Sequence, residues 1–148
     1  MSLTNRINTG IKEAMKAKDD ARKRTLRAIK AQLLLLQTDG TGAEITEEQE
    51  IKLLQKMVKE RQDSYDVYTQ QNREDLAVVE AEELEIIKEF LPEQMNPEDL
   101  KAGLQAIIAK VGASSMKDMG KVMGMANKQF AGKADGKTIS TTIKELLG

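Results

Sequence analysis

Cysteine, histidine and tryptophan are absent from this chain of 148 residues, which has only two tyrosines and two phenylalanines. Without cysteine there are no disulfides, thiolate metal sites or cysteine nucleophiles. Without histidine the chain lacks the commonest general base and the commonest zinc ligand. So few aromatic rings make a stacking platform for single-stranded nucleic acid unexpected. We therefore predict no catalytic residue, no metal site and no cofactor.

Long apolar runs are missing too. No stretch approaches the roughly 18 apolar residues of a membrane span, and the N-terminus lacks the apolar core of a signal peptide. We therefore expect a bacterial-type cytoplasmic protein without a membrane partner. The chain has only two prolines and no alternating runs of β-branched residues, which favours an all-α fold.

Apolar residues recur at helical spacing through the first 93 residues and predict an N-terminal antiparallel bundle of four helices. Asp19 and Asp20 mark the start of the second helix, because acidic residues favour a helix N-terminus. Leu34 and Leu35 widen the apolar stripe of this helix, so we expect contacts from more than one direction. The apolar stripe of the first helix consists of Leu3, Ile7, Ile11 and Met15. The second helix carries a basic face, formed by Lys23, Arg24, Arg27 and Lys30. We interpret the basic face as solvated, with a binding face as the alternative.

The third and fourth helices each carry one charge where an apolar residue is expected. A turn-rich loop, Asp39–Gly42, precedes them, and Thr46 with Gln49 forms a capping box. Arg61 interrupts the apolar stripe of the third helix and Glu83 that of the fourth. A buried charge without a partner is strongly destabilising. We therefore predict a structural ion pair between Arg61 and Glu83, and a catalytic role is the less favoured alternative.

A domain boundary is predicted after the fourth helix, where Pro92 interrupts the chain. We place an N-terminal domain at residues 1–93 and a C-terminal domain of three short helices at residues 94–148. Asn96 and Pro97 open the first of these helices, and Gly112 caps its end. The net charge of −1 is unevenly spread, because residues 95–148 hold eight lysines against five acidic residues. Any nucleic-acid footprint is therefore localised.

The stretch Ser114–Lys137 carries the strongest functional signal. Ser115 with Asp118 forms a capping box, so a helix is expected to start near Met116. On its wheel, Met119, Val122, Met123, Ala126 and Phe130 form one side, and Lys117, Gly120, Lys121, Gly124 and Lys128 the other. Each glycine inside a helix costs about 1 kcal/mol against alanine. Either a partner's backbone, such as a phosphate chain, approaches this bare surface, or another helix of the chain packs there, or the helix breaks.

Four motifs, in matching order and spacing, resemble the GatB/YqeY family. They are Phe90–Gln94, Val111–Ser115, Asp118–Gly124 and Gly132–Gly136. The resemblance covers essentially the whole chain, although the front half alone is weakly specific. Members often have tyrosine before the Leu-Pro pair, and Phe90 stands here, so no hydroxyl chemistry is assigned to it.

The resemblance implies a relation to the B subunit of the tRNA-dependent amidotransferase, which amidates glutamate or aspartate misacylated onto tRNA. Only that subunit's helical tail, which touches the tRNA body, is matched; its catalytic portion has no counterpart here. Carried over by position, the tail's basic, glycine-bearing surface falls on seven residues: Lys117, Gly120, Lys121, Gly124, Lys133, Gly136 and Lys137. Lys128 joins them from the helical wheel.

The resemblance and the residues together predict a tRNA-binding module, accessory to tRNA-dependent amidation and without catalysis of its own. Recognition would use shape and phosphates, not base edges, and DNA is not expected as a partner. One alternative is an adaptor that receives a helix of a protein, for example one of the translation machinery, on the glycine face. Another is a carbon-nitrogen ligase or a tRNA amino acid amidase, although no catalytic constellation is visible.

Overall fold

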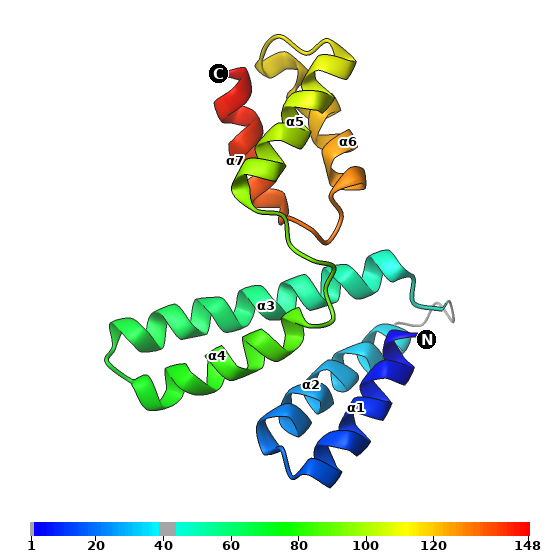
Figure 1. Ribbon diagram of the computed structural model, residues 1–148, viewed down its shortest axis with the longest axis vertical. Helices are drawn as coiled ribbons and strands as arrows, with labels where there is room; N and C mark the ends of the chain where they lie inside the picture. Colours follow the sequence, from blue (N-terminus) through cyan, green and yellow to red (C-terminus); the bar gives the residue numbers. More distant parts are fainter. Residues whose placement is uncertain (1, 39–43) are drawn as a thin grey trace. The chain divides into compact units, whose positions relative to one another are not determined.

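The computed structural model describes residues 2–38 and 44–148, and within these it is all-α, as predicted (Figure 1). The chain divides into two compact units, Met1–Leu91 and Pro92–Gly148, each with its own core. The sequence prediction placed this division two residues later, between residues 93 and 94. The predicted turn-rich loop Asp39–Gly42 lies outside the described residues.

The N-terminal unit consists of two helical hairpins. Its helices are α1 (Leu3–Ala17), α2 (Asp20–Gln37), α3 (Glu47–Gln70) and α4 (Glu74–Lys88). Side-chain hydrogen bonds cap the starts of α1, α2 and α3. At α2, the Asp19 carboxylate accepts from the backbone N–H of Arg22 at 3.0 Å. At the start of α3, Thr46 and Gln49 form the expected capping box. Such caps satisfy N–H groups that have no partner within the helix.

The core of this unit lies where α1 and α2 meet each other and the α3–α4 pair. Its fully or nearly buried side chains are aliphatic: Leu3, Ile7, Leu26, Ile29, Leu33, Leu53, Leu54, Met57 and Ile87. Gly10 sits at the closest approach of α1 to α2, where an added Cβ would lie 2.8 Å from Leu26 Cδ1. The absence of a side chain there allows the two helices to pack tightly.

Two expectations about buried faces are wrong. Met15 is 55% exposed, whereas Ala14 beside it is buried. Leu34 and Leu35 are 51% and 64% exposed, so α2 is not contacted from these directions. The reason is geometric: α2 meets its neighbours through one stripe, and a leucine one or two positions off that stripe points to solvent.

The C-terminal unit packs three helices around a second core. They are α5 (Pro97–Val111), α6 (Met119–Gln129) and α7 (Gly136–Leu147). As expected, Asn96 caps α5, its side chain accepting from the Asp99 N–H at 2.8 Å, and Gly112 ends it at φ 70°. The buried side chains are Leu100, Leu104, Ile107, Val122, Ala126, Phe130, Ile139 and Ile143.

The start of α6 differs from the prediction. A short 3₁₀ turn, Met116–Asp118, precedes the α-helix, which begins at Met119. The Ser115 hydroxyl accepts from the Lys117 N–H at 3.3 Å, and the Asp118 carboxylate accepts from the Ser114 N–H at 3.0 Å. The expected reciprocal capping box is therefore replaced by two hydrogen bonds shifted by one residue, which fit the tighter 3₁₀ geometry.

Candidate functional site

One side of α6 anchors the helix in the core. Val122, Ala126 and Phe130 are buried, while Met119 and Met123 are half-buried. The ring of Phe130 lies against Gly103 of α5, where an added Cβ would be 2.6 Å from Phe130 Cζ. This close contact fixes the rotation of α6 about its axis. The opposite side of the helix is consequently held toward solvent.

That opposite side carries Gly120 and Gly124, and both are exposed. A Cβ built on either glycine would meet no atom within 4 Å. The α-helix also continues through both positions. Neither a helix of the C-terminal unit packed across the glycines nor a break in the helix accounts for them. The glycines leave an open strip of bare helix.

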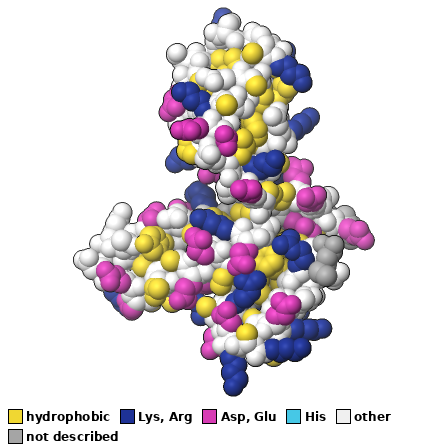
Figure 2. All heavy atoms as spheres, in the orientation of Figure 1, with side chains coloured by type: hydrophobic (Ala, Val, Ile, Leu, Met, Phe, Trp, Pro, Cys, Tyr) yellow, Lys and Arg dark blue, Asp and Glu magenta, His cyan; other side chains and the backbone are white. Residues whose placement is uncertain are grey.

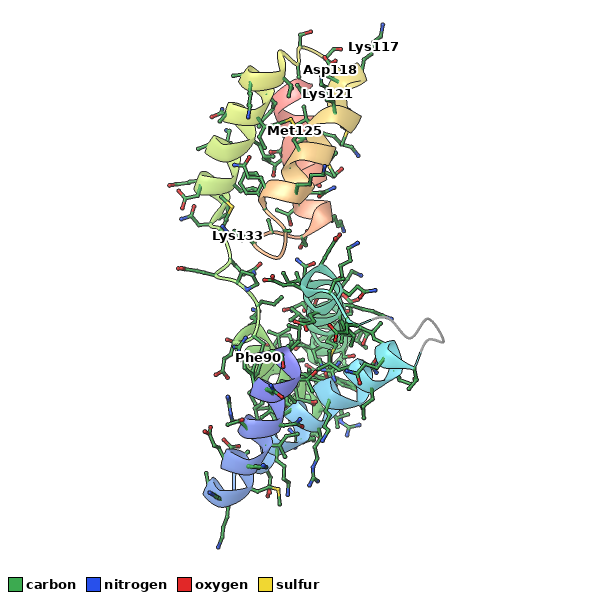
Figure 3. The ribbon with its side chains drawn as sticks, turned by 90° about the vertical axis from the view of Figure 1, so that its right-hand side faces the viewer. Phe90, Lys117, Asp118, Lys121, Met125 and Lys133 are labelled. Atoms are coloured by element: carbon green, nitrogen blue, oxygen red, sulfur yellow. The ribbon has the colours of Figure 1, made fainter. Side chains whose placement is uncertain are left out.

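Lysines border this strip. Lys121 and Lys128 share the strip's side of α6 by helical register, and Lys117 precedes the helix; all three are exposed. Within residues 2–38 and 44–148, every ion pair joins residues of the N-terminal unit, so these ammonium groups have no carboxylate partner. Figure 3 shows Lys117 and Lys121 near the start of α6. We call Lys117, Gly120, Lys121, Gly124 and Lys128 the α6 face.

The remaining candidates lie elsewhere in the unit. Lys133 follows α6 in the loop, and Gly136 and Lys137 form the first turn of α7. Figure 3 places Lys117 and Lys133 at opposite ends of the unit. The Lys133 carbonyl accepts from the Met95 N–H at 3.0 Å, which ties this loop to the segment before α5. Of the eight residues predicted as one surface, five therefore run along α6, whereas Lys133, Gly136 and Lys137 follow its C-terminal end.

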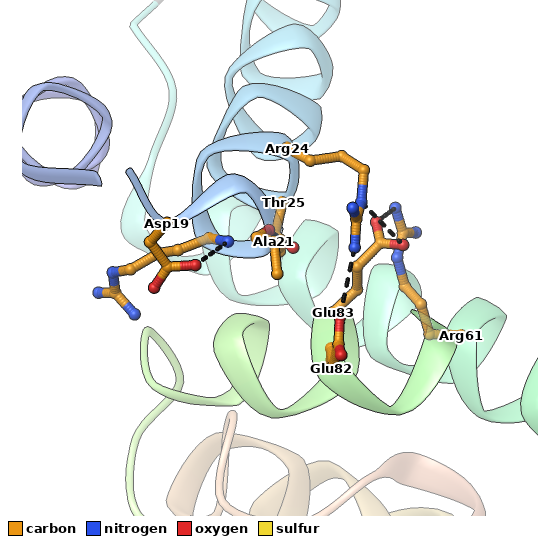
Figure 4. A network of polar contacts seen from close by, with 8 residues as sticks. Asp19, Ala21, Arg24, Thr25, Arg61, Glu82 and Glu83 are labelled. Atoms are coloured by element: carbon orange, nitrogen blue, oxygen red, sulfur yellow. Dashed lines mark hydrogen bonds and ion pairs between the residues drawn. The ribbon is translucent and has the colours of Figure 1, made fainter. Parts of the chain in front are cut away.

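The charged pair inside the N-terminal unit belongs to a larger network (Figure 4). Arg61 Nη2 lies 3.8 Å from Glu83 Oε1, and the two side chains are only 17% and 12% exposed. Arg24 of α2 also approaches this carboxylate, its Nε lying 3.9 Å from Glu83 Oε2, and reaches Glu82 at 3.6 Å. The sequence assigned Arg24 to a solvated face, and only the packing of α2 on α4 reveals its partners.

Glu80 lies beside this network, and its pKa is raised. Burial is the main cause, and the negative charge of Glu83 adds to it, while Arg61 and Arg24 act in the opposite direction. In this network, arginines of α2 and α3 face glutamates of α4. We interpret them as a structural device that fixes the packing of α2, α3 and α4.

No group of three or more metal-ligating side chains occurs in the described part of the chain. Among the same residues, no helix is long and apolar enough to cross a membrane. A family model described as "Yqey-like protein" matches residues 4–147. The chain belongs to the YqeY-like family.

Curated fungal relatives carry the name "Altered inheritance of mitochondria protein 41, mitochondrial". The relative from Clavispora lusitaniae is 41% identical over 90 residues, covering 61% of this chain and 52% of the relative. The relative from Lachancea thermotolerans is 37% identical over 85 residues, covering 57% of this chain and 46% of the relative. The relative from Vanderwaltozyma polyspora is 30% identical over 119 residues, covering 76% of this chain and 64% of the relative. This YqeY-like chain thus spans about half the length of the first two relatives.

These names contradict the cytoplasmic location that we expected. The relatives are named as mitochondrial proteins. The expectation rested on missing cysteines, membrane spans and signal-peptide features. None of these distinguishes one aqueous compartment from another, which is why the prediction failed.

Proposed function

We propose that this YqeY-like protein binds tRNA through the α6 face, as a module accessory to tRNA-dependent amidation and without catalysis of its own. The observation that carries the proposal is the open strip at Gly120 and Gly124, which no part of the C-terminal unit covers. A bare helix lets a ribose-phosphate backbone approach to a distance that side chains would prevent. Lys117, Lys121 and Lys128 would then meet its phosphates.

The charge distribution supports a localised phosphate contact. Ion pairs neutralise much of the charge on the N-terminal unit, whereas the lysines of the α6 face have no acidic partner in the described residues. The absence of tryptophan and the scarcity of other aromatic residues disfavour base stacking. Binding would therefore depend on the shape and charge of folded RNA.

The proposal is tested by titrating tRNA against the wild-type protein and a Lys117→Ala/Lys121→Ala variant at roughly 50 and 200 mM salt. Because the relatives are named as mitochondrial, mitochondrial tRNA belongs among the ligands beside bulk tRNA. Each lost phosphate contact should reduce the slope of log affinity against log salt by about 0.7–0.9. We expect the variant to bind more weakly and with the shallower slope.

Lys101→Ala/Lys110→Ala is the matched control, because it removes two exposed lysines of the same unit from α5. It should retain the wild-type slope. Equal losses of tRNA affinity in both variants would show that only the net charge of the unit matters, and would contradict a specific binding role for the α6 face. Absence of binding at low salt would favour the alternative in which the glycine strip receives a helix of a protein.

A further inference from the structure

A second exposed surface lies on the α1–α2 hairpin, far along the sequence from α6, and the proposed function does not use it. On α1, Thr4, Asn8, Ile11 and Met15 follow one another at spacings of four, three and four residues. On α2, Lys23, Arg27, Lys30 and Leu34 repeat the same spacing. Each set therefore forms one row along its helix. Together they are called the hairpin face.

The two rows lie side by side. Thr4 of the first row and Lys30 and Leu34 of the second line one shallow hollow, with Ile7, Leu33 and Gln37. The contacts to α4 and to the residues just after it leave from other sides of the hairpin. Arg24 reaches Glu82 and Glu83 of α4. After the end of α4, Arg6 lies 4.9 Å from the centre of the Phe90 ring, and Arg22 pairs with Glu89 at 2.7 Å. The hairpin face therefore points away from α4.

The hairpin face combines cations with exposed aliphatic side chains. Met15 and Leu34 are 55% and 51% exposed. Arg27 and Lys30 are exposed and have no acidic partner in the described part of the chain. Asp20 is the acidic residue near this face, and it pairs with Lys23 at 3.7 Å. Figure 2 shows one face of the molecule, where Lys and Arg side chains of the N-terminal unit are interspersed with Asp, Glu and hydrophobic side chains.

We propose that the hairpin face binds the surface of an anionic lipid bilayer. Phosphate groups would attract the cations, but a nucleic acid would leave Met15 and Leu34 against charge and water. The exposed apolar side chains, Met15 and Leu34, lie near the two ends of the hairpin and do not form one continuous groove for a partner helix. A flat bilayer can take up separated aliphatic side chains while lipid headgroups meet the basic residues between them.

This inference revises the expectation of no membrane partner, which considered only spanning segments. Surface association needs no span, because a hairpin lying at the interface keeps its backbone hydrogen bonds within its helices. The charge on the face supplies the attraction, and the aliphatic side chains supply an additional contribution that salt does not screen.

Flotation of the full chain with lipid vesicles tests the proposal. We expect binding to vesicles of phosphatidylcholine and phosphatidylglycerol in equal parts, and little binding to phosphatidylcholine alone. Arg27→Gln/Lys30→Gln should lower the partition coefficient roughly 25-fold, about fivefold for each charge removed. Met15→Ser/Leu34→Ser should lower it at high as well as low salt.

Lys101→Gln/Lys110→Gln is the matched control and should bind the vesicles like the wild type, and thermal unfolding confirms that each variant is folded. Equal binding to both vesicle types, or no binding at low salt, would overturn the proposal. So would loss of vesicle binding in the Lys117→Ala/Lys121→Ala variant, which would move the site to α6. Loss of tRNA binding in Arg27→Gln/Lys30→Gln, with vesicle binding kept, would assign the hairpin face to RNA.

Discussion

Two glycines of the C-terminal unit have opposite surroundings, so alanine substitutions at them should change the unfolding free energy in opposite directions. Gly103→Ala would place a Cβ 2.6 Å from the buried Phe130 ring, and we expect it to destabilise the unit by about 1–3 kcal/mol through overpacking. Gly124→Ala adds a methyl group in open space and should stabilise the unit by about 0.5–1 kcal/mol. Chemical denaturation measures both, and changes of the same sign would contradict this assignment.

Glu80 gives the N-terminal unit a pH dependence of defined sign. Its pKa is raised in the folded state, mainly by burial and next by Glu83. The protonated form therefore favours folding at acidic pH, and this contribution is lost as pH rises through the folded-state pKa. Glu80→Gln should raise the unfolding free energy relative to wild type at neutral pH, and the gain should shrink at mildly acidic pH. Denaturation at several pH values checks this, and a gain that does not depend on pH would contradict it.

At the scale of elements, the Arg24–Arg61–Glu83 network holds three helices together. Arg61→Met leaves the poorly exposed Glu83 carboxylate with Arg24 alone, at 3.9 Å. We expect a loss of about 1–3 kcal/mol in the unfolding free energy. The double variant Arg61→Met/Glu83→Leu should recover much of it, because it leaves no unpaired carboxylate there. If the double variant is no more stable than the single one, the carboxylate is not the source of the loss.

Helix boundaries were largely predictable because local chemistry sets them. Asp19, Thr46, Asn96 and Gly112 all cap the helices as expected. Exposure was less predictable, because a leucine such as Leu35 is buried only if a neighbouring helix reaches it. The 3₁₀ start of α6 was missed, since the residues of a capping box also fit the tighter turn.

For the candidate site, the helical wheel correctly paired the buried side of α6 with an opposite glycine and lysine side. It could not show whether another helix covers the glycines, because this depends on the packing of α5 and α7. It also could not show that Lys137 lies in the first turn of a separate helix, α7. Register within one helix is readable from sequence, whereas distances between elements need the fold.

At the scale of the whole molecule, the two separate cores predict separable stability. Leu104 is completely buried in the C-terminal core, and Leu104→Ala should destabilise that unit by roughly 2–5 kcal/mol. Hydrogen exchange should accelerate across α5, α6 and α7 and stay unchanged in the core of the N-terminal unit. Ile29→Ala, in the N-terminal core, is the reciprocal control. Uniform acceleration over both units would show that they unfold as one.

The α6 face is the centre of this account, and a Gly120→Ala/Gly124→Ala variant tests it most directly. The added methyl groups meet nothing within the C-terminal unit, so the variant should unfold at a higher temperature than the wild type. The same methyl groups would keep a phosphate backbone away from the helix, so tRNA affinity measured alongside should fall. Higher stability with weaker binding is the predicted result. Unchanged affinity in the stabilised variant would contradict a binding role for the bare glycine strip.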